Sequence, residues 1–129
     1  VDSLKLLREI NKQATKHNRV IDCLIQIKIA SEDTKFGMIL NDLQLLLKSD
    51  EFKNLDNIRI KGLMGMASFT TDNLQIESEF KYLKSIFDQI KKKYSDIEIL
   101  SMGMSNDYKL ATKYGSNMVR IGSHIFGSR

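Results

Sequence analysis

Hydrophobic residues recur along this chain with two different periods, and these periods predict its secondary structure. Apolar residues three and four positions apart share one face of a helix, and together with capping residues they predict helices at 4–17, 39–47, 76–94 and 106–114. Apolar runs that alternate with polar residues or are rich in β-branched side chains predict strands at 20–30, 58–67, 97–102 and 118–121. One further helical turn is expected around Phe52.

The longest predicted helix has the clearest pattern. Its apolar positions follow one another at spacings of four and three residues, at Ile76, Phe80, Leu83, Phe87, Ile90 and Tyr94. Asp72 and Gln75 resemble a capping box at its start. We interpret the stripe as core packing rather than as a surface that holds a cofactor.

The alternation of helices and strands predicts an α/β fold. Strands that are separated by helices run parallel, because each helix returns the chain to the same edge of the sheet. Four such strands form either a small doubly wound sheet or half of an eight-stranded (β/α) barrel of the TIM type. Both folds bind ligands at the C-terminal ends of the strands, which are predicted here at 28–36, 64–71, 103–107 and 120–125.

The composition indicates a soluble, cytoplasmic protein. With 129 residues, the chain forms one domain or part of a larger one. Cys23 is the single cysteine, so no intrachain disulfide can form, and we expect this thiol to be buried and unreactive. No apolar run reaches the length of a membrane span, so no membrane contact is expected. The net charge of +4 is spread along the chain, so we expect no nucleic-acid partner.

The segment 100–129 holds the residues best suited to bind a small anion. Ser105 is predicted to be the N-cap of the short helix, where unpaired N–H groups attract negative charge. Gly122 and Ser123 end the last strand with small side chains and open amide groups. Strand alternation directs Arg120 into the mouth of a barrel, where it needs either a ligand or a neighbouring carboxylate.

Other reactive side chains suggest no second site. His17 and His124 each lack a paired carboxylate or a second ligand, so neither a metal site nor a catalytic dyad is predicted. Methionines near the strand ends are interpreted as adaptable packing, at Met64, Met66, Met102 and Met104.

Several motifs stand in order along the chain. They are LSMGMS at 100–105 with Asp107, GS at 115–116, VRIGS at 119–123, and IFG at 125–127 with Arg129. Together they resemble the C-terminal signature of the pyridoxal phosphate homeostasis family, whose fold is a barrel of the alanine racemase N-terminal type. Matches elsewhere extend the resemblance over 1–129, at Val1-Asp2-Ser3, Leu24-Ile25-Gln26-Ile27, Lys35, Gly37 and Gly62-Leu63-Met64.

The resemblance implies a protein that binds pyridoxal 5'-phosphate and buffers or delivers it inside the cell, without catalysis of its own. Ser105, Gly122 and Ser123 would hold the phosphate of the cofactor, or a free phosphate or sulfate, and Arg120 would lie near the pyridine ring. In this family the lysine that forms the Schiff base precedes the part that the chain resembles. Residues 1–129 would then be the C-terminal portion of one barrel domain, with no lysine to attach the cofactor.

Two alternatives remain open at this stage. One is an enzyme of the same fold, such as a racemase or decarboxylase that uses pyridoxal phosphate as an electron sink. The other is an assembly fragment that binds no cofactor. Because the chain starts at Val1 and contains no proline, we expect a fragment. Half a barrel exposes strand edges, so self-association or pairing with the missing N-terminal half is also expected.

Overall fold

The computed structural model describes residues 1–33 and 36–128 and arranges them as alternating helices and strands. Along the chain the elements are α1 (Leu4–Lys16), β1 (Ile21–Gln26), α2 (Leu40–Lys48), α3 (Asp50–Lys53), β2 (Ile58–Met64), α4 (Asn73–Lys91), β3 (Ile99–Met104), α5 (Tyr108–Lys113), β4 (Met118–Arg120) and α6 (Ser123–Phe126). The predicted helices and strands are therefore confirmed, including the short turn α3 around Phe52.

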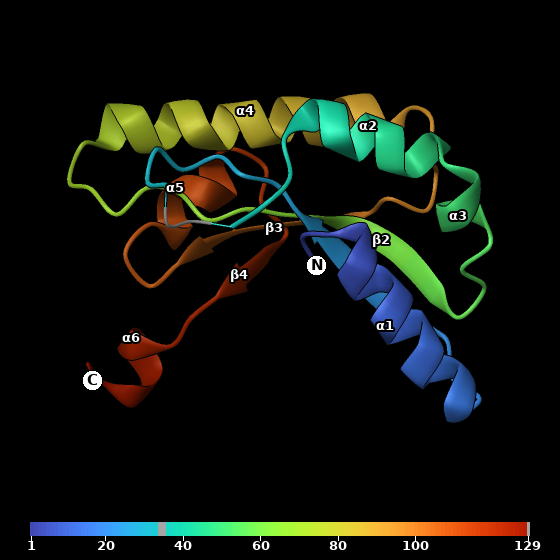
Figure 1. Ribbon diagram of the computed structural model, residues 1–129. Helices are drawn as coiled ribbons and strands as arrows, with labels where there is room; N and C mark the ends of the chain where they lie inside the picture. Colours follow the sequence, from blue (N-terminus) through green and yellow to red (C-terminus); the bar gives the residue numbers. More distant parts are fainter. Residues whose placement is uncertain (34–35, 129) are drawn as a thin grey trace.

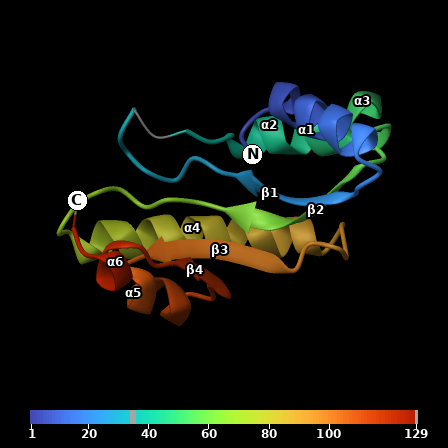
Figure 2. The ribbon, with the colours of Figure 1, turned by 90° about the horizontal axis from the view of Figure 1, so that it is seen from below.

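The four strands form one parallel sheet in the order β1-β2-β3-β4. Helices α2 and α4 cover one face of this sheet (Figure 1). Seen from below, β2 and β3 lie in front of α4, and no helix of the described residues crosses over them (Figure 2). Sequential parallel strands with their helices on one face are the arrangement of a partial barrel, because a doubly wound sheet carries helices on both faces.

The apolar stripe of α4 forms the centre of the core, as predicted. Phe80 and Leu83 are fully buried there, and Ile86 is 1% exposed. Cys23 is buried with them, and burial raises the pKa of its thiol, so the unreactive protonated form persists at neutral pH. At the start of α4, Asp72 accepts hydrogen bonds from the N–H groups of Leu74 and Gln75.

The strand ends differ from the prediction because of pairing between segments distant in sequence. β1 stops at Gln26 rather than at Ala30, because the chain after it pairs with Met38. The N–H of Lys28 donates to the carbonyl of Met38, and the N–H of Met38 donates to the carbonyl of Gln26. The capping box is only half formed. The N–H of Asp72 donates to Thr70, and the side chain of Gln75 turns elsewhere.

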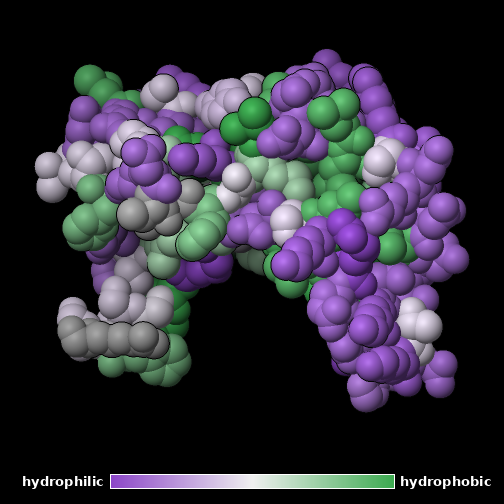
Figure 3. All heavy atoms as spheres, viewed as in Figure 1, coloured by the Kyte–Doolittle hydropathy of each residue, from purple (hydrophilic) through white to green (hydrophobic). Residues whose placement is uncertain are grey.

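The surface is divided between polar and apolar regions. In Figure 3, side chains over α1 are largely hydrophilic, whereas α6 projects from the molecule with hydrophobic side chains. On α6, Ile125 is 66% exposed and Phe126 is 86% exposed. Among the described residues, no helix combines the length and the apolar character needed to cross a membrane.

Gly62 lies where β2 and β3 approach each other closely. It pairs with Ile99 of β3, next to an irregularity in the β1–β2 register. A Cβ atom at this position would lie 1.9 Å from the carbonyl oxygen of Ile99, a contact that only a shift of the backbone can relieve. The absence of a side chain at Gly62 is therefore a condition for the β2–β3 pairing.

We predict that Gly62→Ala destabilises the protein by about 1–3 kcal/mol, because the added methyl group forces β2 and β3 apart. The measurement is the midpoint of urea unfolding. Gly122→Ala is the matched control, since a Cβ atom there meets nothing within 4 Å. Equal midpoints for the two variants would contradict the prediction.

Candidate functional site

The ends of β3 and β4 lie together at the C-terminal edge of the sheet. Ser105 follows β3 and is 8% exposed, and its hydroxyl oxygen accepts a hydrogen bond from the backbone N–H of His124, at 3.3 Å. His124 belongs to α6, which begins directly after Gly122. The rings of Tyr108 and His124 meet edge to face, with centroids 6.2 Å apart, and so also hold α6 against α5. Ser105 is thus brought to the turn that contains Gly122 and Ser123.

The prediction that Ser105 caps the short helix is wrong. α5 begins at Tyr108, and the residue in the N-cap position is Asp107. The carboxylate of Asp107 turns back and accepts a hydrogen bond from the N–H of Met104, at 2.7 Å. Because Asp107 closes this turn, the hydroxyl of Ser105 is left to face α6 instead of the helix start.

Arg120 reaches across the sheet from the last residue of β4. Its Nη2 donates a hydrogen bond to the carbonyl oxygen of Gly65, at 3.0 Å, while its Nε is buried without a partner among the described residues. Burial lowers the pKa of this guanidinium, and the negative charge of Asp107 acts in the opposite direction. No ion pair of Arg120 is recorded in the described ranges, so its contact is a carbonyl rather than the neighbouring carboxylate that was the alternative.

Gly122 and Ser123 form the turn between β4 and α6. Gly122 has no atom within 4 Å of the place where a Cβ would stand, so the space beside it is open. Its carbonyl accepts hydrogen bonds from Ile125 and Phe126, whereas the N–H groups of Gly122 and Ser123 donate to none of the described residues. Open amide groups beside a glycine are the features that let a phosphate approach the backbone closely.

Two polar residues to which the sequence analysis gave no structural role, Ser116 and Asn117, fix the position of β4. The hydroxyl oxygen of Ser116 lies 2.6 Å from the carbonyl oxygen of Met102 and 3.0 Å from that of Met118. Asn117 accepts a hydrogen bond from the N–H of Leu100 and donates one to the carbonyl of Glu98, each at 2.8 Å. Their sequence signal was a polar pair immediately before a strand. These contacts set where Arg120 and the following turn lie.

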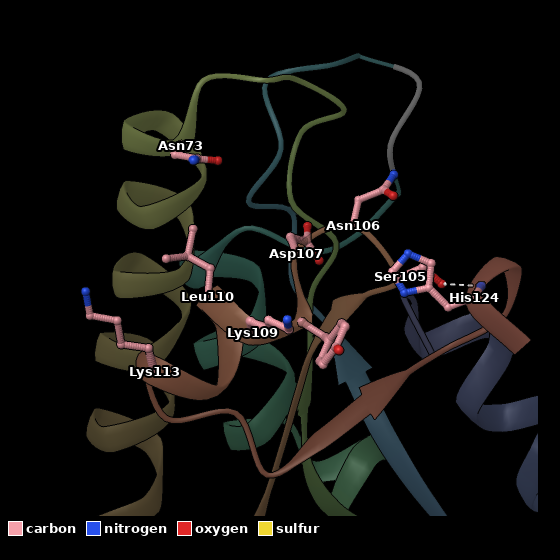
Figure 4. A pocket seen from close by; sticks show the side chains of 9 residues that line it. Asn73, Ser105, Asn106, Asp107, Lys109, Leu110, Lys113 and His124 are labelled. Atoms are coloured by element: carbon pink, nitrogen blue, oxygen red, sulfur yellow. Dashed lines mark hydrogen bonds between the residues drawn. The ribbon is translucent and has the colours of Figure 1, made fainter.

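A hollow of about 500 Å³ opens beside the Ser105–His124 contact, on the side of α5 (Figure 4). Most of the residues that line it have polar side chains, and together they are Asn73, Ser105, Asn106, Asp107, Tyr108, Lys109, Leu110, Lys113 and His124. Of the predicted site residues only Ser105 belongs to it. Arg120, Gly122 and Ser123 do not line the hollow, so it adjoins the predicted anion site rather than coinciding with it.

Part of the motif set that carries the resemblance lies beyond the described residues. Lys35 and Arg129, which carry part of the resemblance, lie outside the described residues. Within the described part of the chain, no cluster of three or more potential metal ligands occurs.

The parallel strands with their flanking helices define a protein of the α/β-barrel class. A buried hydroxyl, an arginine and an open glycine turn at the C-terminal strand ends form its candidate anion site. Comparison with known sequences agrees with this class. The chain belongs to the family of the alanine racemase N-terminal domain, whose sequence model matches residues 1–129.

Two curated relatives each share more than a third of the aligned residues with this chain. The chain is 37% identical over 131 residues to the pyridoxal phosphate homeostasis protein of Pasteurella multocida, and covers 55% of that protein. It is 36% identical over 126 residues to the protein of the same name from Helicobacter pylori, and covers 54% of it. The chain therefore spans about half the length of these relatives, while 98% or more of its own length is matched.

Solved structures show the same fold. PipY from Synechococcus elongatus in its form with pyridoxal phosphate bound superposes with a TM-score of 0.84 at 25% identity, covering 98% of this chain and 58% of PipY. A protein from Bifidobacterium adolescentis superposes with a TM-score of 0.85 at 28% identity, covering 98% of this chain and 51% of that one. Alanine racemase from Clostridium difficile, at 21% identity and a TM-score of 0.66, shares the fold only.

We predict that Ser105→Ala loosens α6 without unfolding the sheet, because it removes the acceptor of the His124 N–H. Amide hydrogen exchange at His124 should become about three- to tenfold faster, as expected for the loss of one hydrogen bond. Ser123→Ala is the control, since Ser123 is exposed. Unchanged exchange at His124 in the Ser105 variant would show that the contact does not hold α6.

Proposed function

We propose that this chain binds pyridoxal 5'-phosphate through its phosphate group and takes part in buffering or delivering the cofactor in the cytoplasm. Ser105, Gly122 and Ser123 hold the phosphate, and Arg120 faces the pyridine ring. The same clamp also accepts free phosphate or sulfate. We propose further that residues 1–129 are the part of the barrel that contains this clamp and lacks the lysine that attaches the cofactor.

The observation that carries this proposal is the contact between Ser105 and the N–H of His124. This hydrogen bond brings the end of β3 to the turn after β4, so the hydroxyl of Ser105 lies beside a turn whose first N–H groups donate to none of the described residues. Hydroxyl and N–H donors at a glycine turn suit the oxygens of a phosphate. The names of the curated relatives, and the bound cofactor of PipY, identify pyridoxal phosphate as the corresponding ligand in proteins of this family.

The environment of Arg120 also suits an anionic aromatic ligand. Its Nε is buried and has no partner among the described residues, which leaves a donor available beside the one that contacts Gly65. A desolvated guanidinium gains from a nearby acceptor or negative charge. Pyridoxal phosphate supplies a ring nitrogen and a phosphate, and its reactive aldehyde gives the bound cofactor its chemistry.

The proposal is a carrier rather than an enzyme. The curated relatives are named for homeostasis of the cofactor and not for a reaction, and the likeness to alanine racemase supports the fold alone. A carrier requires the phosphate clamp and reversible retention of the ligand, and the residues at these strand ends bind and orient without a paired acid and base.

We predict that the chain binds pyridoxal phosphate without a stable covalent bond. The measurement is an absorbance titration followed by borohydride reduction and peptide mass analysis. Pyridoxal, which lacks the phosphate, should bind at least about tenfold more weakly if the phosphate is the group that the clamp recognises. A stoichiometric, borohydride-stable adduct on one lysine of the chain would overturn the noncovalent part of the proposal.

Arg120→Met tests the clamp itself, with Arg59→Met as the matched loss of charge. Arg59 is paired with Asp22 at the other end of the strands, so its replacement should leave the affinity unchanged. Arg120→Met should weaken the affinity for pyridoxal phosphate by about tenfold or more, because it removes a charged donor. Equal affinities in the two variants would contradict the proposed site.

We further propose that the chain pairs with another copy of itself or with the remainder of a barrel. β1 and β4 are the outer strands of the sheet, so each presents an edge that no other described strand covers. The exposed Ile125 and Phe126 of α6 follow β4 closely in sequence and add apolar surface near that edge.

We predict that analytical ultracentrifugation of the chain detects association that grows with concentration. Phe126→Lys should weaken it, because a charge would replace a side chain that is 86% exposed beside β4. Phe69→Lys is the control, since Phe69 is 85% exposed but lies in the loop after β2. A monomer at all concentrations tested would contradict the pairing proposal.

A further inference from the structure

α4 carries a carboxylate into the buried layer beneath the loops at the strand ends. Glu79 is 9% exposed, and its two oxygens accept hydrogen bonds from the N–H of Ser68 at 2.6 Å and from the hydroxyl of Ser68 at 2.7 Å. The amide of Gln75 donates a further bond at 3.2 Å. No ion pair of Glu79 is recorded within 1–33 and 36–128. Neutral donors alone therefore stabilise this buried charge.

Through Ser68, the carboxylate joins two loops that are distant in sequence. The N–H of Ser31, in the β1–α2 loop, donates to the hydroxyl oxygen of Ser68 at 2.8 Å. The two serine hydroxyls lie 3.1 Å apart, and Gln75 also donates to Ser31 at 3.1 Å. A second link runs in parallel, from the N–H of Phe69 to the carboxylate of Glu32 at 2.6 Å. The β1–α2 and β2–α4 loops are thus tied to each other and to α4.

The second of these loops also carries the acceptor of Arg120. Gly65 opens the loop that contains Ser68, and its carbonyl receives the Nη2 of Arg120 at 3.0 Å. The N–H of Gly65 is bound to the carbonyl of Ser101 on β3, at 3.0 Å. β3 therefore fixes Gly65, at the start of the segment 65–68, and Glu79 fixes Ser68 at its end. Arg120 binds to the carbonyl of this segment's first residue.

We propose that Glu79 is a positioning residue that locks the β1–α2 and β2–α4 loops together and, through the Gly65 carbonyl, orients Arg120 for pyridoxal phosphate. The last step rests on the proposed function, whereas the locking of the loops does not. Loss of the carboxylate leaves the N–H and hydroxyl of Ser68 without their acceptors. The Ser31–Ser68 link and the segment that begins at Gly65 are then held less firmly, because Ser68 is no longer anchored to α4.

A carboxylate at position 79 suits the surrounding hydrogen-bond donors better than an amide does. Ser68 and Gln75 together present three donor groups, and an ionised carboxylate only accepts hydrogen bonds. In Glu79→Gln, the oxygen of the new amide can still accept from the N–H of Ser68. Its nitrogen, however, faces the donors of the Ser68 hydroxyl and Gln75. The conservative variant should therefore retain part of the link, whereas Glu79→Ala loses all of it.

The first experiment measures amide hydrogen exchange in the ligand-free protein. In Glu79→Ala, exchange at Ser68 and also at Ser31 should be about tenfold faster, with an intermediate rate in Glu79→Gln. Ser31 is the decisive probe because its N–H contacts Ser68 and not Glu79. Asp88→Asn is the matched control, an exposed carboxylate on α4 paired with Lys84. If exchange at Ser31 is unchanged in Glu79→Ala, the locking of the loops is wrong.

If Glu79→Ala does not fold, Glu79→Gln takes its place. This variant keeps the acceptor of the Ser31 N–H on Ser68 and removes the acceptor of the Ser68 hydroxyl. Faster exchange at Ser31 is again the expected result, and an unchanged rate again overturns the proposal.

The second experiment is a double-mutant cycle on the affinity for pyridoxal phosphate, with Glu79→Gln and Arg120→Lys singly and together. If Glu79 acts through Arg120, the loss in the double variant should be clearly smaller than the product of the two single losses. Independent, multiplicative losses would overturn the link to Arg120. If the wild-type protein does not bind pyridoxal phosphate, the proposed function and the Arg120 step fail together, while the exchange at Ser31 still decides the locking of the loops.

Discussion

The buried carboxylate of Glu79 imposes the constraint on which the loops at the C-terminal edge of the sheet depend. Among the described residues it is the one charged residue that is buried, and a buried charge is tolerated only when hydrogen-bond donors surround it. α4 cannot supply these donors alone, because two of the three come from Ser68 in the preceding loop. The conformation of that loop is therefore a requirement of the core, even though the loop itself lies at the rim.

Arg120 carries the opposite charge and also loses contact with water, so it too needs hydrogen-bond partners. It is also desolvated, yet it meets the neutral carbonyl of Gly65 instead of the carboxylate of Glu79. A direct buried ion pair would consume the donors of the guanidinium and satisfy both charges at once. Keeping the two charges apart leaves Nε of Arg120 without an acceptor among the described residues. The bond to Gly65 offsets part of the cost of desolvating the cation, and an acceptor for Nε would offset more of it.

Periodicity predicted the elements and their parallel order, because those features follow from local patterns of burial. The periodicity of α4 also indicates one buried polar residue that the sequence analysis did not name. Position 79 falls on the same helix face as Ile76 and Leu83, so a glutamate there marks a buried polar contact. The role of Ser105 and the existence of α6 could not be derived in this way. A serine before a helix resembles an N-cap, and only the approach of His124, from beyond β4, shows that its hydroxyl bonds elsewhere.

The geometry of the candidate anion site is determined within a short part of the chain. Ser105 and the turn at Gly122 follow neighbouring strands, and α5 connects those strands directly. Ser116 and Asn117 fix the register between them through bonds to Leu100 and Met102. The geometry of the candidate anion site therefore depends on β3, β4 and their connection, whereas the orientation of Arg120 depends on the loop after β2. A change in that loop can therefore move the guanidinium of Arg120 while Ser105 and the turn at Gly122 keep their positions.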